Sequence, residues 1–107
     1  MKSFKLSNGI THIPLELPWT SPGFVNVYLI EDSDGYIMID CGVNGEKYFS
    51  LLKNYLMEEK IELNEIKLLI GTHMHSDHIG LSGSLRNEGI PFALYKNSVD
   101  FLNEYND

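Results

Sequence analysis

Three histidines and an aspartate lie within six consecutive residues, in the segment His73-Met74-His75-Ser76-Asp77-His78. The chain has 4 histidines in all, and the fourth, His12, is distant in sequence. Neutral imidazole is the commonest metal ligand in proteins, and imidazole combined with carboxylate suits zinc, iron or manganese. These residue types therefore predict a metal site. A solvated histidine-rich loop is the alternative, although such tracts themselves favour metal binding.

The stretch before the histidines indicates how they are held. Residues 66–70 form a short, mostly apolar run with branched side chains, which predicts a buried strand. Side chains two apart in an extended chain point the same way, so His73 and His75 can reach one metal together. Asp77 and His78 are adjacent, and a helix beginning near Asp77 would direct both toward a second metal. Two-metal sites hold their ions roughly 3.5–4 Å apart, which such a bend allows.

Three segments together resemble one known family. The order His73-x-His75-x-Asp77-His78, followed by Ile79-Gly80, resembles the metal motif of the metallo-β-lactamase fold superfamily. Residues 26–30 (Asn-Val-Tyr-Leu-Ile) and 37–42 (Ile-Met-Ile-Asp-Cys-Gly) resemble two strands of that family. The three segments match in order and spacing over about residues 10–95. Cys41 and Leu81 depart from the usual pattern, at positions that are not ligands in the family.

The resemblance implies a role for each matching residue. His73 and His75 would bind a first metal, and Asp77 and His78 a second. Asp77 would also hold the attacking water or hydroxide. Asp40 resembles the family's buried aspartate that orients the metal loop, a kind of contact that fixes ligand rotamers; alternatively, it caps the turn at Gly42. The implied cofactors are two divalent ions, zinc first, with iron or manganese as alternatives.

The remaining pattern predicts an α/β fold with one mixed sheet and about three helices. Strands are expected over 3–6, 10–16, 24–31, 36–41, 66–70 and 91–95, and helices over 45–60, 77–87 and 97–105. An Asp-Gly turn should join the third and fourth strands. Pro14 makes the second an edge strand at best, and His12 is expected to be an ordinary strand residue. This arrangement resembles the N-terminal half of the family's four-layer αββα sandwich.

Residues 1–107 are therefore expected to be the N-terminal part of a single domain whose C-terminal half is absent. Several strands are apolar on both faces, and such strands need cover on both sides. Four ligands for two metals are also few, because a catalytic zinc usually has three protein ligands. We expect either the missing half or self-association to cover the sheet.

Composition and charge narrow the class of protein. The net charge of −7, from 8 basic and 15 acidic residues, disfavours nonspecific nucleic-acid binding, since such binding needs basic surface. We expect no membrane span, because no apolar run approaches ~18 residues, and no signal peptide at the N-terminus. The single cysteine, Cys41, suits a reducing compartment and predicts a cytoplasmic protein. Cys41 is expected to behave as a small buried apolar residue.

The expected function is a metallo-hydrolase acting on a small-molecule thioester or other small ester through a metal-bound hydroxide. His75 argues against the flavodiiron branch of the family, which has glutamate there, and His78 against the β-lactamase branch with arginine. The alternatives are an oxidoreductase resembling the persulfide dioxygenases, with a single iron, or a non-catalytic metal-binding fragment. The 107 residues alone are expected to be inactive. Trp19 could pack over substrate or serve packing alone.

Overall fold

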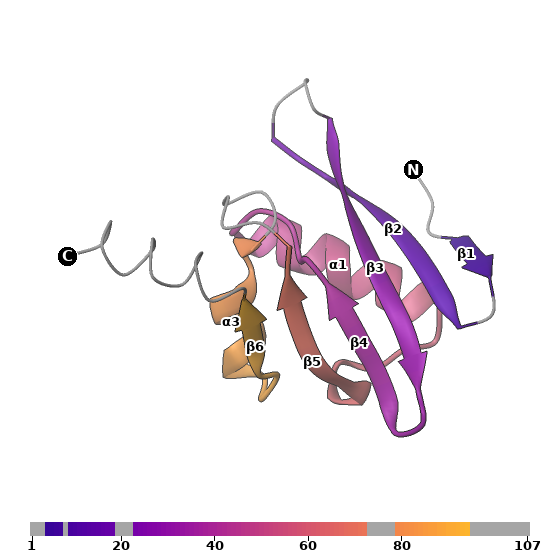
Figure 1. The fold of residues 1–107 in the computed structure, drawn as a ribbon. Helices are drawn as coiled ribbons and strands as arrows, with labels where there is room; N and C mark the ends of the chain where they lie inside the picture. The colour runs from indigo at the N-terminus through magenta and orange to yellow at the C-terminus, as the bar shows by residue number, and fades with distance from the viewer. Residues whose placement is uncertain (1–3, 8, 19–22, 73–78, 95–107) are drawn as a thin grey trace.

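The computed structural model describes residues 4–7, 9–18, 23–72 and 79–94. In this part of the chain, six strands form one sheet in the order of the sequence. The first three pairings are antiparallel and the last two are parallel, so the sheet is mixed as expected (Figure 1). The strands are β1 (Phe4–Ser7), β2 (Ile10–Glu16), β3 (Phe24–Asp32), β4 (Gly35–Ile39), β5 (Ile66–Gly71) and β6 (Phe92–Leu94).

The antiparallel half contains the expected tight hairpin. Asp32 pairs with Gly35, leaving Ser33 and Asp34 as the two-residue turn between β3 and β4. The Asp32 carboxylate accepts a hydrogen bond from the Ser33 N–H (2.8 Å) and forms an ion pair with Lys67 of β5 (2.5 Å). The pKa of Asp32 is lowered, mainly by its hydrogen bond with Lys67. These contacts hold the hairpin against the start of β5.

Strand β2 has a neighbour on each side over its first residues. It pairs with β3 along all seven residues, and the described residues of β1 pair with Ile10 to His12. The expectation of an edge strand is therefore wrong for that first part. Pro14 lies beyond the described residues of β1.

Both helices that connect the parallel strands lie on the same face of the sheet, behind it in Figure 1. Helix α1 (Glu46–Glu58) links β4 to β5, and α3 (Ser82–Asn87) links β5 to β6. A short 3₁₀ helix (Leu63–Glu65) precedes β5. The covered face carries the core, which includes Ile13, Leu15, Val27, Leu29, Met38, Leu52, Leu56, Leu69 and Leu85.

The two helices end in the same way. After α1, the Ile61 N–H donates to the Leu56 carbonyl, while Lys60 has a positive φ of 59°. After α3, the Ile90 N–H donates to the Leu85 carbonyl, with Gly89 at φ 90°. This bond, around a residue with positive φ just after the helix, is characteristic of the Schellman motif.

None of the described helices is long and apolar enough to span a membrane.

The start of α3 differs from the expected helix over 77–87. Ile79 is helical, residues 80 and 81 form a turn, and α3 begins at Ser82. Ile79 also forms a bridge with Gly42, and the Gly80 N–H donates to the Gly42 carbonyl. Residues 77 and 78, and the helix expected over 97–105, lie outside the described residues.

Candidate metal centre

The carboxyl ends of β4 and β5 meet at one edge of the sheet, and a carboxylate bonds across that edge. Asp40 follows β4, and Thr72 follows β5. The Asp40 carboxylate accepts hydrogen bonds from the Thr72 N–H (2.8 Å) and the Thr72 hydroxyl (2.5 Å). The Asp40 N–H in turn donates to the Ile70 carbonyl (2.9 Å). In parallel sheets this edge is where ligands usually bind.

Asp40 is held in an unusual state. Its side chain is buried, with only 3% of its surface exposed, and its backbone has a φ of 63°. A left-handed conformation costs free energy at most residues other than glycine, and aspartate tolerates it better than most. The bonds from Thr72 satisfy a carboxylate that would otherwise be costly to bury. Strain and burial at one residue indicate a position that is fixed by its surroundings.

Gly42, two residues after Asp40, contacts the chain just after the histidine segment. Gly42 forms a parallel bridge with Ile79, and its carbonyl accepts a hydrogen bond from the Gly80 N–H at 2.7 Å. Residues 40–42 thus anchor Thr72 before the segment and Gly80 after it. The expected ligands His73, His75, Asp77 and His78 all lie between these two anchors, outside the described residues. Their assignment as ligands stays a prediction.

Gly71 allows the close packing behind this edge. A Cβ atom there would lie 2.8 Å from Ile79 Cγ2 and 2.9 Å from Leu94 Cδ1. The end of β5 therefore packs directly against the residue that follows the histidine segment. The strand expected over residues 66–70 stops short of Gly71, which is the last residue of β5. A glycine two residues before the first proposed ligand, His73, is a signal for such a close approach.

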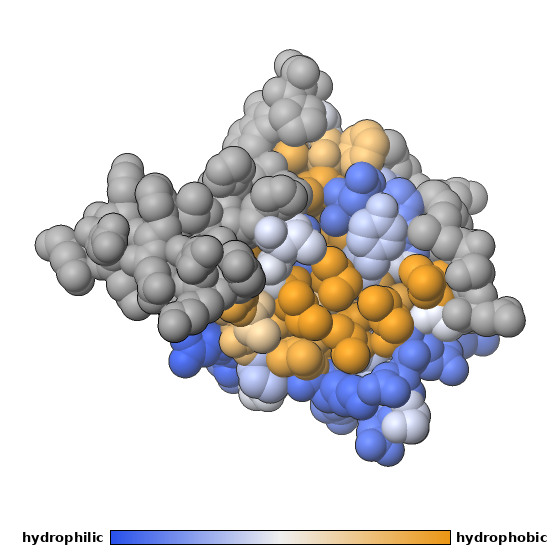
Figure 2. Space-filling view, in the orientation of Figure 1, coloured by the Kyte–Doolittle hydropathy of each residue, from blue (hydrophilic) through white to orange (hydrophobic). Residues whose placement is uncertain are grey.

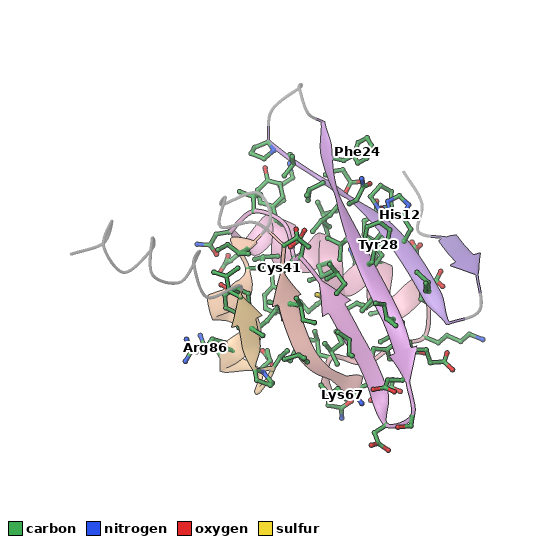
Figure 3. All side chains as sticks on the ribbon, in the orientation of Figure 1. His12, Phe24, Tyr28, Cys41, Lys67 and Arg86 are labelled. Carbon is green, nitrogen blue, oxygen red and sulfur yellow. The ribbon has the colours of Figure 1, made fainter. Side chains whose placement is uncertain are left out.

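Cys41 lies between Asp40 and Gly42 in the sequence, at the opposite end of the sheet from Lys67 (Figure 3). Its side chain is fully buried, and this burial raises the pKa of the thiol to about 12. The thiol is therefore protonated at neutral pH. The expectation of a small buried apolar residue is confirmed.

His12 has partners within the sheet. Its Nε2 atom lies 2.7 Å from Asn26 Oδ1, and its ring stacks on Tyr28 with the ring centroids 5.1 Å apart. Among the described residues no three histidine, cysteine, aspartate or glutamate side chains gather in a way that could hold a metal. The expected role of His12 as an ordinary strand residue agrees with this geometry.

A surface hollow of about 480 Å³ lies elsewhere in the described part of the chain. It is lined by Lys53, Leu56, Met57, Lys60, Ile61, Glu62 and Leu63. These residues belong to the end of α1 and the connection into β5. The hollow is therefore at the amino end of β5, whereas the histidine segment follows its carboxyl end.

The geometry at Gly42 yields a stability prediction. Gly42 has a φ of +85°, and a Cβ there would lie 2.5 Å from Leu15 Cδ2. Gly42→Ala should lower the free energy of unfolding by about 2–4 kcal/mol, because it adds backbone strain and overpacks the core. The measurement is urea unfolding followed by circular dichroism.

Gly83→Ala is the matched control for this change. Gly83 lies within α3, and nothing is within 4 Å of a Cβ placed there. Alanine is the better helix former by up to ~1 kcal/mol, so this variant should be as stable as the parent chain or more so. Equal stability of the two variants would contradict the proposed strain at Gly42.

The comparison with known families decides the class of the protein. A model of the metallo-beta-lactamase superfamily matches residues 20–95. The chain belongs to this superfamily. The matched range contains β3 to β6 and the whole histidine segment. The expected family and the expected α/β fold, a partial metallo-beta-lactamase sandwich, are confirmed.

Individual relatives and a solved structure agree with this family assignment. The chain is 32% identical to the lactamase-like protein nscB of Trichophyton rubrum, over 70% of this chain and 23% of that protein. It is 36% identical to the probable metallo-hydrolase YqjP of Bacillus subtilis, over 55% of this chain and 18% of that protein. A metallo-beta-lactamase family protein of Thermus thermophilus, TTHA1429, superposes with a TM-score of 0.72 at 27% identity, over 79% of this chain and 28% of that one. The chain thus spans about a quarter of the length of these relatives.

Proposed function

We propose that residues 73–78 form the metal-binding segment of a hydrolase active site. The observation that carries this proposal is the double anchor at residues 40–42, which bonds to Thr72 before the segment and to Gly80 after it. A binding segment needs ligands whose positions are fixed by rigid neighbours. Membership of the metallo-beta-lactamase superfamily supports the assignment.

The donor set suits zinc. Three imidazoles and one carboxylate lie within six residues, and zinc binds both ligand types readily. His73 and His75 would hold one ion, and Asp77 and His78 another. When bound by these residues, zinc would supply a coordinated water with a pKa lowered toward ~7 and would polarise the bond to be cleaved.

Two of the chain's own residues have tasks in this proposal, and Cys41 takes no part in the reaction. Asp77 orients the attacking water, and Asp40 acts as a positioning residue through Thr72. Cys41 remains a neutral, buried thiol, because its pKa is about 12. A covalent mechanism through this cysteine is therefore disfavoured, and direct attack by water is the route that these residues support.

The proposed substrate is a thioester or another small ester. The net charge of −7 gives little attraction for nucleic acid.

The proposed ligand set is incomplete within this chain. Four ligands shared between two ions give two ligands for each ion, whereas a catalytic zinc usually has three protein ligands. We therefore propose that the complete site draws further ligands from polypeptide outside residues 1–107, so that this chain alone does not turn over substrate.

A hydrolysis assay tests the proposed function. A longer protein that contains residues 1–107 and completes the fold should cleave an acyl thioester with added zinc and lose this activity with a chelator. Residues 1–107 alone should give only the uncatalysed rate. A phosphodiester and a persulfide are the comparison substrates. Oxygen consumption with the persulfide, or robust turnover by the 107-residue chain, would contradict the proposal.

A further inference from the structure

The hollow at the end of α1 has an apolar wall. It encloses about 480 Å³ between the end of the helix and the connection into β5, and four apolar side chains form the wall: Leu56, Met57, Ile61 and Leu63. Leu56 and Ile61 are buried, whereas Met57 is 72% exposed. Sites for small molecules have volumes in this range and are mostly apolar, with a few polar groups that orient the ligand.

The hollow is on the helix side of the sheet. Every described residue that lines it belongs to α1 or to the connection between α1 and β5. Figure 2 shows the other side of the molecule, where apolar side chains of the sheet gather. In an αββα sandwich the second sheet packs on that other side and the helices form the outer layers, so the second sheet does not cover the hollow.

Two lysines, Lys53 and Lys60, stand at the rim of the hollow. They are about two helical turns apart, which brings both to the same side of α1. Lys53 Nζ lies 4.5 Å from the centroid of the Phe49 ring. In the part of the chain that the structure describes, neither lysine forms an ion pair with an acidic side chain. The rim therefore offers two ammonium groups to one ligand, in a chain whose net charge is −7.

The backbone of Lys60 has a conformation that favours glycine. Its φ is 59°, and it follows α1 at the position that Gly89 occupies after α3. A left-handed backbone costs free energy at a lysine and little at a glycine. Strain of this kind is often found at functional positions. Since the helix end gains nothing from lysine over glycine, the charge that Lys60 brings to the rim is the feature that needs a ligand.

We propose that the hollow binds a medium-chain aliphatic carboxylate. The alkyl chain would lie along the apolar wall, where Met57 can adapt to its shape, and burial of its methylene groups would supply most of the affinity. The carboxylate would accept charge-assisted hydrogen bonds from Lys53 and Lys60. This inference is independent of the metal centre, because the hollow is at the amino end of β5 and the histidine segment follows its carboxyl end.

The charge balance of the rim limits the head group to a single negative charge. Glu62 is the acidic residue among the described residues that line the hollow, so two lysines and one glutamate leave one positive charge in excess. The Glu62 N–H donates to the Glu65 carboxylate (2.9 Å), which fixes this segment at the start of the 3₁₀ helix. A ligand with several phosphates would meet repulsion from Glu62 without enough cations to balance it.

Equilibrium dialysis with decanoate tests the proposal. The protein is the longer one that contains residues 1–107 and completes the fold, and a chelator is present because zinc itself binds carboxylates. We expect one decanoate per chain with a dissociation constant on the order of 0.1–1 mM, since the hollow is open to water. Butyrate, with about six fewer methylene groups, should bind at least 10-fold more weakly. Decyltrimethylammonium, a cation with the same chain length, should also bind at least 10-fold more weakly.

Lys60→Gly separates loss of the ligand from loss of the fold. It should weaken decanoate binding about 5- to 10-fold, while the midpoint of thermal unfolding stays the same or rises, because glycine relieves the left-handed backbone. Glu62→Gln should have the opposite effect and tighten binding about twofold, because it removes a repelling charge. Lys47→Gln is the matched control: Lys47 is exposed at the other end of α1, and this variant should bind decanoate within about twofold of the parent.

A second variant tests the apolar wall. Met57→Glu places a carboxylate where the alkyl chain is expected, on an exposed position of α1, and it should weaken binding at least 10-fold. Circular dichroism verifies that each variant is folded. The proposal would be overturned by no bound decanoate at about 5 mM, by equal binding of decyltrimethylammonium, by unchanged binding in Lys60→Gly and Met57→Glu, or by equal weakening in Lys47→Gln.

Discussion

Replacing His75 with alanine is expected to lower the zinc affinity of the chain by about 100-fold or more, since even outer-shell changes cost 10–100-fold. The imidazole that is removed belongs to the proposed first site, and the remaining His73 is a poor site alone. The measurement is a competition titration against a chromophoric chelator, together with the zinc content of the purified protein.

His12→Ala is the control for this experiment. It removes the same kind of side chain from β2, where His12 bonds to Asn26, and it should leave zinc affinity within about twofold.

The pH dependence of zinc binding provides an independent check, because a histidine must be neutral to bind a metal and its ordinary pKa is about 6.5. Affinity should therefore be full at neutral pH and fall as the pH drops below ~6. Unchanged zinc content in His75→Ala, or affinity that is flat down to pH ~5, would refute the ligand assignment.

Replacing Asp40 with alanine should lower the free energy of unfolding by about 2–4 kcal/mol. The change leaves the Thr72 N–H and hydroxyl without their carboxylate, and it places alanine, which tolerates a left-handed backbone less well than aspartate, at φ 63°. Zinc affinity of the folded variant should fall 10–100-fold, the usual effect of losing a residue that orients ligands. Urea unfolding and zinc titration measure the two effects.

Two further variants sharpen the interpretation of Asp40. Asp34→Ala removes the same charge from the exposed β3–β4 turn, and it should change stability by less than about 0.5 kcal/mol. Thr72→Val removes only the hydroxyl donor, so its effects should be smaller than those of Asp40→Ala. Zinc affinity unaltered in folded Asp40→Ala would show that Asp40 supports the sheet without positioning the metal segment.

Local patterns predicted most of the elements. The expected strand over residues 10–16 has the observed bounds of β2, and the helix expected over 45–60 is α1 with its ends trimmed. The Asp-Gly turn falls where it was expected, between Asp32 and Gly35. Such features depend on side-chain periodicity and turn chemistry within a few residues, which the sequence displays directly.

The contacts that hold the candidate site could not be predicted in this way. Asp40 and Thr72 are 32 residues apart in the chain and meet because β4 and β5 pair in parallel. The pairing of β1 with the start of β2 is likewise a contact between strands, which Pro14 alone does not reveal. Family resemblance supplied the role expected of Asp40, while its bonding to Thr72 required the three-dimensional arrangement.

The bonds that join residues 40–42 to Thr72 and Gly80 come from backbone groups, the Asp40 carboxylate and the Thr72 hydroxyl. None of these bonds uses a side chain of residues 73–78. We therefore expect single substitutions among the proposed ligands to leave these bonds in place. Separating the groups that close a turn from the groups that bind a ligand is one physical route by which a single fold acquires many activities.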